Sequence, residues 1–213
     1  MDYQFTNNWF ESSTKGVWDD FLPFIAPQKV LEVGSYEGAS TCYLIENLDK
    51  TAKLEIHCID TWDGSAEFFT DEYADVDMTS VEQRFDENTC LALQKTKAKQ
   101  VTDVNLIKHK GRSDHHLPRL LADGNKSTFD LIYIDGSHQA PDVISDAIMG
   151  FQLLQVGGVM VFDDYLWAED LPQGRDLLRC PKPAIDAFTN LYFRKVEVIK
   201  APLYQLFVRK TSE

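Results

Sequence analysis

The sequence predicts an α/β domain with a doubly wound, mostly parallel sheet of seven strands that ends in an antiparallel pair. Three observations lead to this fold class. Short apolar runs alternate along the chain with segments of helical periodicity. The runs lack polar alternation, which is typical of parallel strands buried on both faces. The last two runs are joined by so few residues that they can pair only in the antiparallel sense.

The expected elements follow one another in order. Five apolar runs predict the parallel strands: Lys29–Val33, Leu54–Ile59, Asn105–His109, Leu131–Ile134 and Val159–Phe162. After the first strand, Ala39–Leu48 has apolar residues at helical spacing. Before the fifth, Pro141–Leu154 has a proline at its start and is followed by the helix-stopping pair Gly157-Gly158.

The C-terminal part breaks this rhythm. A helix near Pro183–Leu191 precedes two strands, Lys195–Ile199 and Leu203–Arg209, which are joined by a short connection. We expect these strands to pair with each other at one edge of the sheet. The length of 213 residues is that of one domain, so residues 1–213 are expected to form a single unit.

Composition favours a folded, acidic protein. Acidic residues number 34 against 21 basic ones, which gives a net charge of −13, and 44% of the residues are hydrophobic. A surface this negative repels phosphate backbones, so we expect no general binding to nucleic acid or to anionic membranes. No apolar stretch is long enough to span a membrane, and the four cysteines form no CxxC pair. We therefore expect reduced thiols and a cytoplasmic location.

Two segments lie outside the alternating plan. Residues 1–28 carry several aromatic side chains. Three interpretations are open: these side chains line the binding site of the acceptor, they pack a helix on the core, or they form the contact between two copies of the chain in a homo-oligomer. Residues 64–90 follow the second strand and hold eight acids against one base. Ligands bind beyond the carboxyl ends of the strands in open α/β sheets, which is the side that this segment leaves from. We expect a lid; a solvated helical insertion is the alternative.

The turn after the first strand has two glycines, Gly34 and Gly38, which let the backbone bend sharply and approach a ligand. A dinucleotide turn of the GxGxxG type needs a close second glycine to admit a pyrophosphate, but Tyr36 stands at that position. Glu32, just before the turn, suits an amino group or hydroxyl and repels phosphate. A tight turn without any ligand is the alternative.

The next two strand ends also carry candidate binding residues. Asp60 ends the second strand, where a carboxylate can accept hydrogen bonds from both hydroxyls of a ribose. Its alternative role is in a turn or helix cap. After the third strand, the run Gly111–Asp114 can close over an adenine, although the same run is also an ordinary turn and helix start.

Carboxylates gather after the fourth and fifth strands. Asp135 and His138 follow the fourth strand, and the adjacent pair Asp163 and Asp164 follows the fifth. Three carboxylates from neighbouring strand ends form an oxygen-rich cluster that suits Mg²⁺, Mn²⁺ or Ca²⁺. The alternatives are a turn with a helix cap for the aspartates and a structural role for His138.

Taken together, these motifs resemble the class I S-adenosylmethionine-dependent methyltransferases, whose sheet is Rossmann-like. The closest likeness is to the branch with the IDGSH motif, near the macrocin- and catechol-type O-methyltransferases. The matching motifs are Glu32–Thr41 (EVGSYEGAST), Ile59–Gly64 (IDTWDG), Ile134–His138 (IDGSH) and Phe162–Tyr165 (FDDY). The resemblance extends from about Lys29 to Arg209, which is nearly the whole chain.

The resemblance implies a role for each matching residue. The cofactor-binding residues would be Glu32, Gly34, Ser35 and Gly38 at the methionine part, Ser40 near its carboxylate, Asp60 and Thr61 at the ribose, Arg112 and Ser113 at the adenine, and Asp135. In metal-using relatives, carboxylates that match Asp135, Asp163 and Asp164 hold Mg²⁺. The catalytic residues would be Asp135 and His138, either of which could take the proton of the acceptor.

The activity that this resemblance implies is in-line transfer of a methyl group from S-adenosylmethionine to an oxygen of a small hydroxylated molecule, with a divalent metal assisting. Two other classes stay open at the level of the sequence. One is a non-catalytic nucleoside-binding or assembly module. The other is a nicotinamide-dependent oxidoreductase, which Tyr36 in the glycine turn disfavours.

Overall fold

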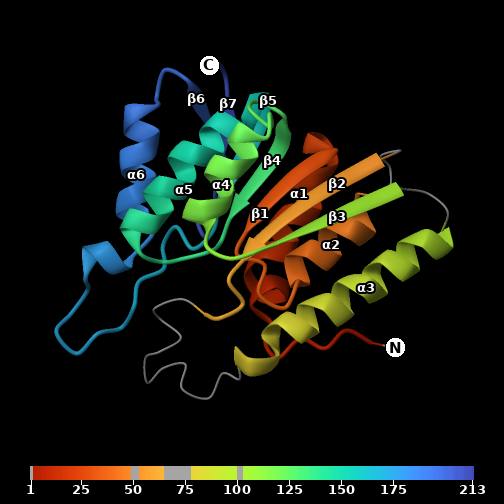
Figure 1. The fold of residues 1–213 in the computed structure, drawn as a ribbon. Helices are drawn as coiled ribbons and strands as arrows, with labels where there is room; N and C mark the ends of the chain where they lie inside the picture. The colour runs from red at the N-terminus through yellow and green to blue at the C-terminus, as the bar shows by residue number, and fades with distance from the viewer. Residues whose placement is uncertain (1, 49–52, 65–77, 100–102) are drawn as a thin grey trace.

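The computed structural model describes residues 2–48, 53–64, 78–99 and 103–213 (Figure 1). Its centre is a seven-stranded sheet in the order β3-β2-β1-β4-β5-β7-β6. The strands are β1 (Lys29–Val33), β2 (Lys53–Asp60), β3 (Asp103–Lys110), β4 (Phe129–Ile134), β5 (Leu154–Phe162), β6 (Val196–Ile199) and β7 (Leu206–Lys210). The first five are parallel, whereas β7 runs antiparallel to both β5 and β6. The predicted fold class is confirmed.

Helices cover both faces of this sheet (Figure 1). The α-helices are α1 (Lys15–Ile25), α2 (Ala39–Asn47), α3 (Val81–Lys99), α4 (Ser113–Ala122), α5 (Ala140–Leu153) and α6 (Lys182–Leu191). The shorter helical turns among the described residues are η1 (Phe10–Thr14, a π-helix), η4 (Met78–Ser80) and η5 (Leu177–Arg179). Within the described residues, no helix combines the length and apolar character needed to cross a membrane.

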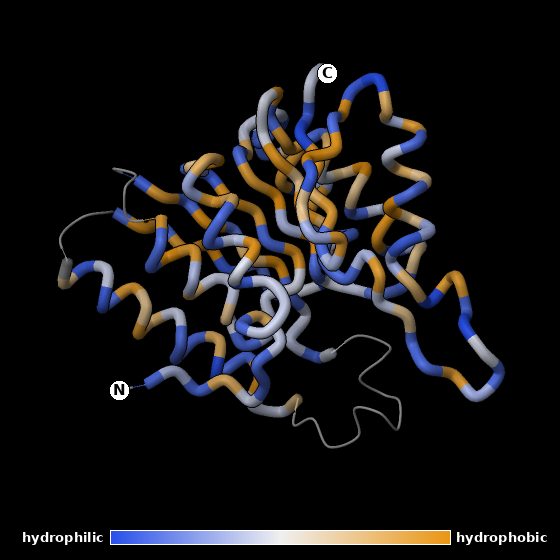
Figure 2. The backbone as a smooth tube through the Cα atoms, turned by 180° about the vertical axis from the view of Figure 1, so that it is seen from behind, coloured by the Kyte–Doolittle hydropathy of each residue, from blue (hydrophilic) through white to orange (hydrophobic). Residues whose placement is uncertain are grey.

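Two hydrophobic cores separate the layers. One lies between the sheet and α4, α5 and α6, and the other between the sheet and α1, α2 and α3. In Figure 2 the hydrophobic colour concentrates on the strands at the centre of the molecule. The strands β1 and β4 contribute to both cores, because successive residues of a strand point to opposite faces. This double burial explains why their sequences are apolar without alternation.

The junction between α5 and β5 differs from the prediction. The pair Gly157-Gly158 was expected to stop the helix, but α5 ends at Leu153 and β5 runs through both glycines. The pairing of β5 with β4 shifts register there, between Phe129 and Leu131 of β4. Gly157 has φ +90°, and a Cβ on Gly158 would lie 3.0 Å from the Asp130 carbonyl oxygen. The glycines therefore form an irregularity inside the strand.

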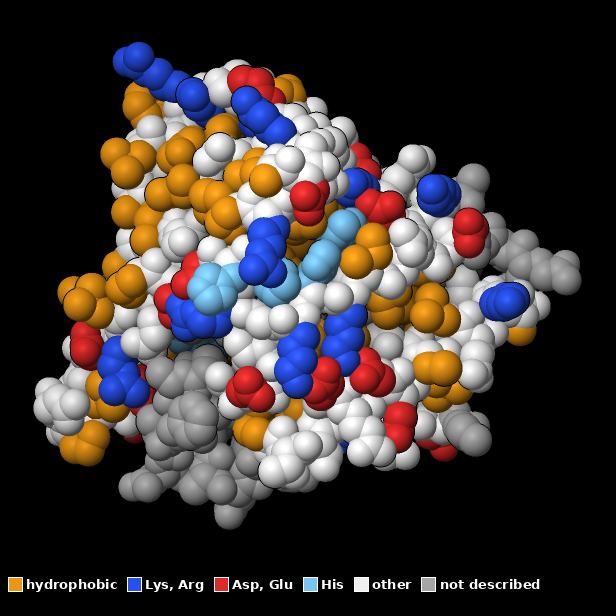
Figure 3. Space-filling model, in the orientation of Figure 1, with side chains coloured by type: hydrophobic (Ala, Val, Ile, Leu, Met, Phe, Trp, Pro, Cys, Tyr) orange, Lys and Arg blue, Asp and Glu red, His pale blue; other side chains and the backbone are white. Residues whose placement is uncertain are grey.

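A pair of histidines joins β2 to β3 on the side covered by α4. His57 Nδ1 lies 2.9 Å from His109 Nε2, and the two rings stack with centroids 5.1 Å apart. The ring of His116, from α4, lies 5.5 Å from that of His109. Histidine side chains gather beside lysine and arginine on the face seen in Figure 3. Burial, and then the neighbouring His57 and His116, lower the pKa of His109 to about 4, and burial lowers the pKa of His57.

This pair predicts a loss of stability in mild acid. An unfolded histidine takes up its proton near pH 6.5, so between pH 6.5 and about 4 the unfolded state binds more protons than the native state, and stability falls as the pH falls. The contribution of the half-exposed His109 is on the order of 1–2 kcal/mol. Urea unfolding of wild type and His109→Gln at pH 7, 6, 5 and 4.5 should show a shallower decline in the variant. The exposed His115→Gln serves as the control, and equal declines in wild type and His109→Gln would contradict the assignment.

Candidate active site

A cavity of about 500 Å³ opens at the carboxyl ends of the parallel strands. The loops that follow β1, β2, β3, β4 and β5 all line it, together with the segment that precedes α1. Of the residues predicted for a site, its walls include Gly34, Ser35, Ser40, Asp60, Thr61, Arg112, Ser113, Asp135, His138, Asp163 and Asp164. Glu32 and Gly38 are not among its lining residues. Most of the sequence motifs therefore meet at one cavity.

The glycine turn after β1 lies directly against the end of β4. Gly34 has φ +86°, and a Cβ at this position would lie 2.0 Å from the backbone oxygen of Asp135. Tyr36 also has a positive φ, of 46°, which is uncommon for a residue with a large side chain. Gly38 has φ +82° and lies against Phe85 of α3. The two glycines thus permit a turn whose backbone packs tightly on both sides.

Glu32 acts inside the turn, behind the cavity wall. Its side chain is fully buried and accepts hydrogen bonds from the hydroxyls of Ser35 (2.6 Å), Ser40 (2.5 Å) and Thr41, and from the thiol of Cys58. Burial raises the pKa of Glu32 against the lowering effect of these donors. In this arrangement the carboxylate fastens the turn to the first turn of α2 and to β2.

Asp60 fixes the other side of the same turn. Its Oδ2 accepts from the backbone N–H groups of Ser35 and Tyr36, both at 2.8 Å, and its Oδ1 accepts from the N–H of Trp62 at 2.7 Å. The carboxylate lines the cavity as well. A carboxylate offers about four acceptor positions, so these three bonds leave capacity for a ligand hydroxyl.

The N-terminal segment is tied to the outside of the turn. Buried Glu37 accepts hydrogen bonds from the backbone N–H and the hydroxyl of Thr6, both at 2.7 Å, and from Arg84 Nε at 2.5 Å. Beyond Thr6, the half-exposed Trp9 lines the cavity, and its ring lies 5.6 Å from that of Tyr36. The predicted aromatic segment therefore divides, because Trp18 is fully buried in the core.

The predicted lid can be followed only in part. Of the acidic segment 64–90, residues 65–77 lie outside the described residues. The remainder includes η4 and the first half of α3, and Met78 lines the cavity.

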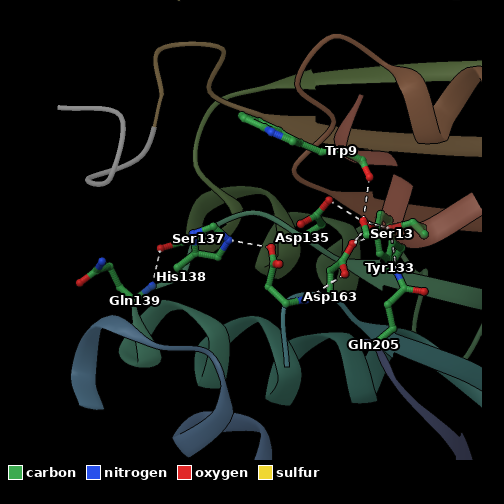
Figure 4. A network of polar contacts seen from close by, with 11 residues as sticks. Trp9, Ser13, Tyr133, Asp135, Ser137, His138, Gln139, Asp163 and Gln205 are labelled. Carbon is green, nitrogen blue, oxygen red and sulfur yellow. Dashed lines mark hydrogen bonds and ion pairs between the residues drawn. The ribbon is translucent and has the colours of Figure 1, made fainter. Parts of the chain in front are cut away.

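A tyrosine lies between two of the predicted catalytic and metal-binding carboxylates (Figure 4). The hydroxyl of Tyr133, on β4, donates to Asp163 Oδ2 and lies 2.9 Å from Asp135 Oδ2. Thr14 also contacts Asp163, at 3.4 Å, and Gln205 contacts Thr14. Burial, followed by repulsion from neighbouring aspartates, raises the pKa of both Asp135 and Asp163.

The third predicted metal-binding carboxylate, Asp164, points toward His138 and not toward Tyr133. Asp164 has φ +54°, and its Oδ2 lies 2.8 Å from His138 Nε2. The imidazole of His138 stacks on Trp167 with centroids 4.0 Å apart, and its Nδ1 is buried. Asp164 thus holds one ring nitrogen while Trp167 holds the ring plane.

These directions do not fit the predicted magnesium site. Asp135 and Asp163 turn toward Tyr133, whereas Asp164 turns toward His138. Across the part of the chain that the structure describes, no group of three His, Cys, Asp or Glu side chains is arranged to hold a metal ion. Asp135, Asp163 and Asp164 do line one cavity, but their side chains make hydrogen bonds to Tyr133 and His138 and do not converge on one point.

The predicted site residues do not include Tyr133 or Asp146. Tyr133 was assigned only to the apolar run of the fourth strand, and Asp146 of α5 was not singled out at all. Asp146 is 3% exposed and lines the cavity near Ser113. A signal for it existed, since an acidic residue at position 146 interrupts the apolar face formed by Val143, Ala147 and Gly150.

Comparisons with known proteins agree with this arrangement. A family model described as a methyltransferase domain matches residues 31–165. A probable caffeoyl-CoA O-methyltransferase of Dictyostelium discoideum is 26% identical over 171 residues, which cover 76% of this chain and 57% of that protein. The chain thus spans little more than half the length of this relative.

Solved structures share the fold. The O-methyltransferase TomG from Streptomyces achromogenes, in complex with SAM, matches with a TM-score of 0.59 and 17% identity over 94% of this chain and 81% of that one. An O-methyltransferase from Bacillus cereus, in complex with SAH, matches with a TM-score of 0.59 and 16% identity over 93% of this chain and 82% of that one.

The sheet order places the cavity at the switch between β1 and β4, which is where open α/β sheets bind their ligands. Because the family model matches more than half of the sequence, the chain belongs to the methyltransferase domain family.

The Glu32 network predicts a stability effect. Glu32→Gln replaces an acceptor oxygen with an amide group that cannot accept from the surrounding hydroxyls, and we expect a loss of about 1–3 kcal/mol in the free energy of unfolding. Urea denaturation measures this loss, with the exposed Glu197→Gln as the matched control. A loss no greater than that of the control would show that the buried carboxylate does not hold the turn.

The contacts of Glu37 predict an effect on the N-terminal segment. Glu37→Gln removes the charge that pairs with Arg84 and weakens the bonds to Thr6, so the Thr6 amide should exchange its hydrogen about tenfold faster. Native-state hydrogen exchange measures this rate. The control is Glu87→Gln at an exposed position of α3, which should leave the exchange rate of the Thr6 amide unchanged. An unchanged rate in Glu37→Gln would show that other contacts hold the N-terminal segment.

Proposed function

We propose that the protein transfers a methyl group from S-adenosylmethionine to an oxygen of a small hydroxylated molecule. The observation that carries the proposal is one cavity with the glycine turn and Asp60 on one wall and the Asp135 carboxylate beside them. Its volume of about 500 Å³ lies within the range of small-molecule sites. The O-methyltransferases among the relatives and solved structures support the same reaction class.

The residues that line the cavity can be assigned, in their order along the chain, to successive parts of S-adenosylmethionine. Gly34 and Ser35 present backbone to the methionine part, with Ser40 near its carboxylate, and Asp60 has acceptor capacity for a ribose hydroxyl. Arg112 and Ser113, which follow β3, also line the cavity, and we assign them to the adenine. Glu32 supports this site from behind, through Ser35 and Ser40.

Asp135 is the residue best placed to take the proton of the acceptor. Its Oδ2 contacts Tyr133, and its Oδ1 has no hydrogen-bond partner among the described residues and lies at the cavity wall. His138 is less suited to this role, because Nε2 is bonded to Asp164 and Nδ1 is buried. His138 therefore positions Asp164, while Asp135 faces the acceptor.

When bound, S-adenosylmethionine supplies an electrophilic methyl group on a sulfonium. The acceptor oxygen forms the new C–O bond as the S–C bond breaks, and its proton passes to Asp135 Oδ1. Tyr133 holds Asp135 in place through Oδ2, and the negative cavity wall favours a cationic sulfonium. Trp9 and Trp167 line the cavity and offer aromatic surface to the acceptor. Because the carboxylates do not fit a shared metal ion, no step is assigned to magnesium.

This proposal predicts a division between Asp135 and His138. Asp135→Asn removes the proton acceptor at constant shape, so kcat for methyl transfer should fall about 10²–10⁴-fold, while binding of S-adenosylhomocysteine measured by calorimetry stays within about tenfold. His138→Gln should cost only about tenfold in kcat, since it disturbs the position of Asp164. An equal loss in both variants would contradict the assignment of proton transfer to Asp135 alone.

The same assays test the cofactor and the metal. Wild type should bind S-adenosylhomocysteine and not NAD, with the same affinity in Mg²⁺ and in EDTA. Failure to bind would contradict the proposed function. A loss of turnover in EDTA that Mg²⁺ restores would show that the carboxylates rearrange around a metal.

A further inference from the structure

The strand β6 (Val196–Ile199) is an open edge of the sheet. It stands last in the strand order and pairs only with β7 among the strands of the described residues (Figure 1). On its outer side, no described strand supplies partners for its backbone N–H and C=O groups. Such an edge is a template on which an extended segment of another chain can add as a further strand.

Apolar side chains accompany this edge from its beginning to its end. The turn from α6 into β6 is tight, because the N–H groups of Lys195 and Val196 both bond to the carbonyl oxygen of Tyr192. Four apolar side chains on the edge and its two flanking turns are each more than half exposed: Leu191, Phe193, Val198 and Leu203. Single exposed apolar residues need no explanation, but several along one open strand mark a surface that suits a partner.

The charge of the edge is opposite to that of the molecule. Residues 191–209 hold four basic side chains against one acid, in a chain whose net charge is −13. That acid, Glu197, lies opposite Arg209 in the β6–β7 register. Three exposed cations remain at the ends of the edge: Arg194 and Lys195 before β6, and Lys200 after it. Within the described residues these three form no ion pair, so they favour an acidic partner.

A second copy of the chain is a poor occupant of this edge. Two β6 strands that pair about a twofold axis run antiparallel, and a pairing centred on the strand places Lys195 of one copy opposite Lys200 of the other. Like charges directly opposite each other destabilise a pair of strands. The same geometry indicates what fits, which is a strand with apolar side chains at its centre and acidic side chains at both ends.

We propose that the outer side of β6 binds an extended acidic segment of a partner protein, which adds to the sheet as a further strand. A lipid surface would meet the cations but offers no strand to the open backbone groups. Because β6 runs parallel to β5, it ends on the cavity side of the sheet, and the connection to β7 includes Tyr204, which lines the cavity. The bound segment would therefore extend to the rim of the candidate active site. The inference does not depend on the proposed function.

The first test is calorimetric titration of the whole protein with two capped peptides. One peptide alternates valine and threonine and has a glutamate at each end, and the other has a lysine at each end instead. Wild type should bind the glutamate peptide about tenfold more tightly. The double variant Lys195→Glu with Lys200→Glu should reverse this preference. Lys53→Glu with Lys126→Glu makes the same charge change at exposed positions elsewhere and should keep the wild-type preference.

The second test separates strand addition from attraction of charge alone. When the glutamate peptide is bound, the β6 amides that do not bond to β7 should exchange their hydrogens about tenfold more slowly. Tighter binding of the glutamate peptide without this protection would overturn the proposed strand.

The remaining outcomes also decide. Wild type that binds neither peptide or both equally, or a double variant that keeps the wild-type preference, overturns the proposal. Light scattering that shows a dimer of wild type and a monomer of the double variant would assign the edge to a second copy instead. Binding to vesicles of phosphatidylcholine and phosphatidylserine, lost in the double variant and accompanied by no peptide binding, would assign it to a lipid surface. Neither result would bear on the methyltransferase proposal, since Lys195 and Lys200 do not line the cavity.

Discussion

The close approach of the β1 turn to the end of β4 is the constraint on which the site depends. Gly34 lets the two backbones meet where a Cβ would collide with the Asp135 carbonyl oxygen at 2.0 Å. The glycine turn and the aspartate that we assign to proton transfer are thereby joined through backbone rather than through flexible side chains. A substitution at Gly34 would separate them, and the positive φ of 86° adds strain to any residue with a Cβ.

Carboxylates surround this junction, and their different partners give them different tasks. Glu32 and Asp60 both hold the turn, but Glu32 is sealed behind it whereas Asp60 remains at the cavity. Asp163 is occupied by Tyr133 and Asp164 by His138, whereas Oδ1 of Asp135 has no hydrogen-bond partner among the described residues. The three aspartates that suggested a shared cation from the sequence thus make their hydrogen bonds to Tyr133 and His138.

The strands could be predicted from the sequence, but some residues of the candidate site could not. The strands were predictable because β1, β4 and the second half of β5 are buried on both faces and are therefore mostly apolar. The pair Gly157-Gly158 misled, since glycine permits a strand irregularity as readily as a helix stop. Tyr133 and Asp146 escaped notice because both belong to segments that were interpreted only as core. Whether a strand tyrosine packs or donates depends on contacts made by Asp163, thirty residues away, which no local pattern encodes.

The N-terminal segment shows how the two halves of the cavity are coupled. Glu37 belongs to the glycine turn, yet its carboxylate binds Thr6, three residues before Trp9 at the cavity wall. The following π-helix contributes Ser13 and Thr14 to the same wall, and Thr14 contacts Asp163. π-Helical turns are rare and occur frequently at functional sites. The glycine turn on one side of the cavity is therefore connected through Glu37 and Thr6 to the N-terminal segment on the other side, so both sides of the cavity share one continuous support.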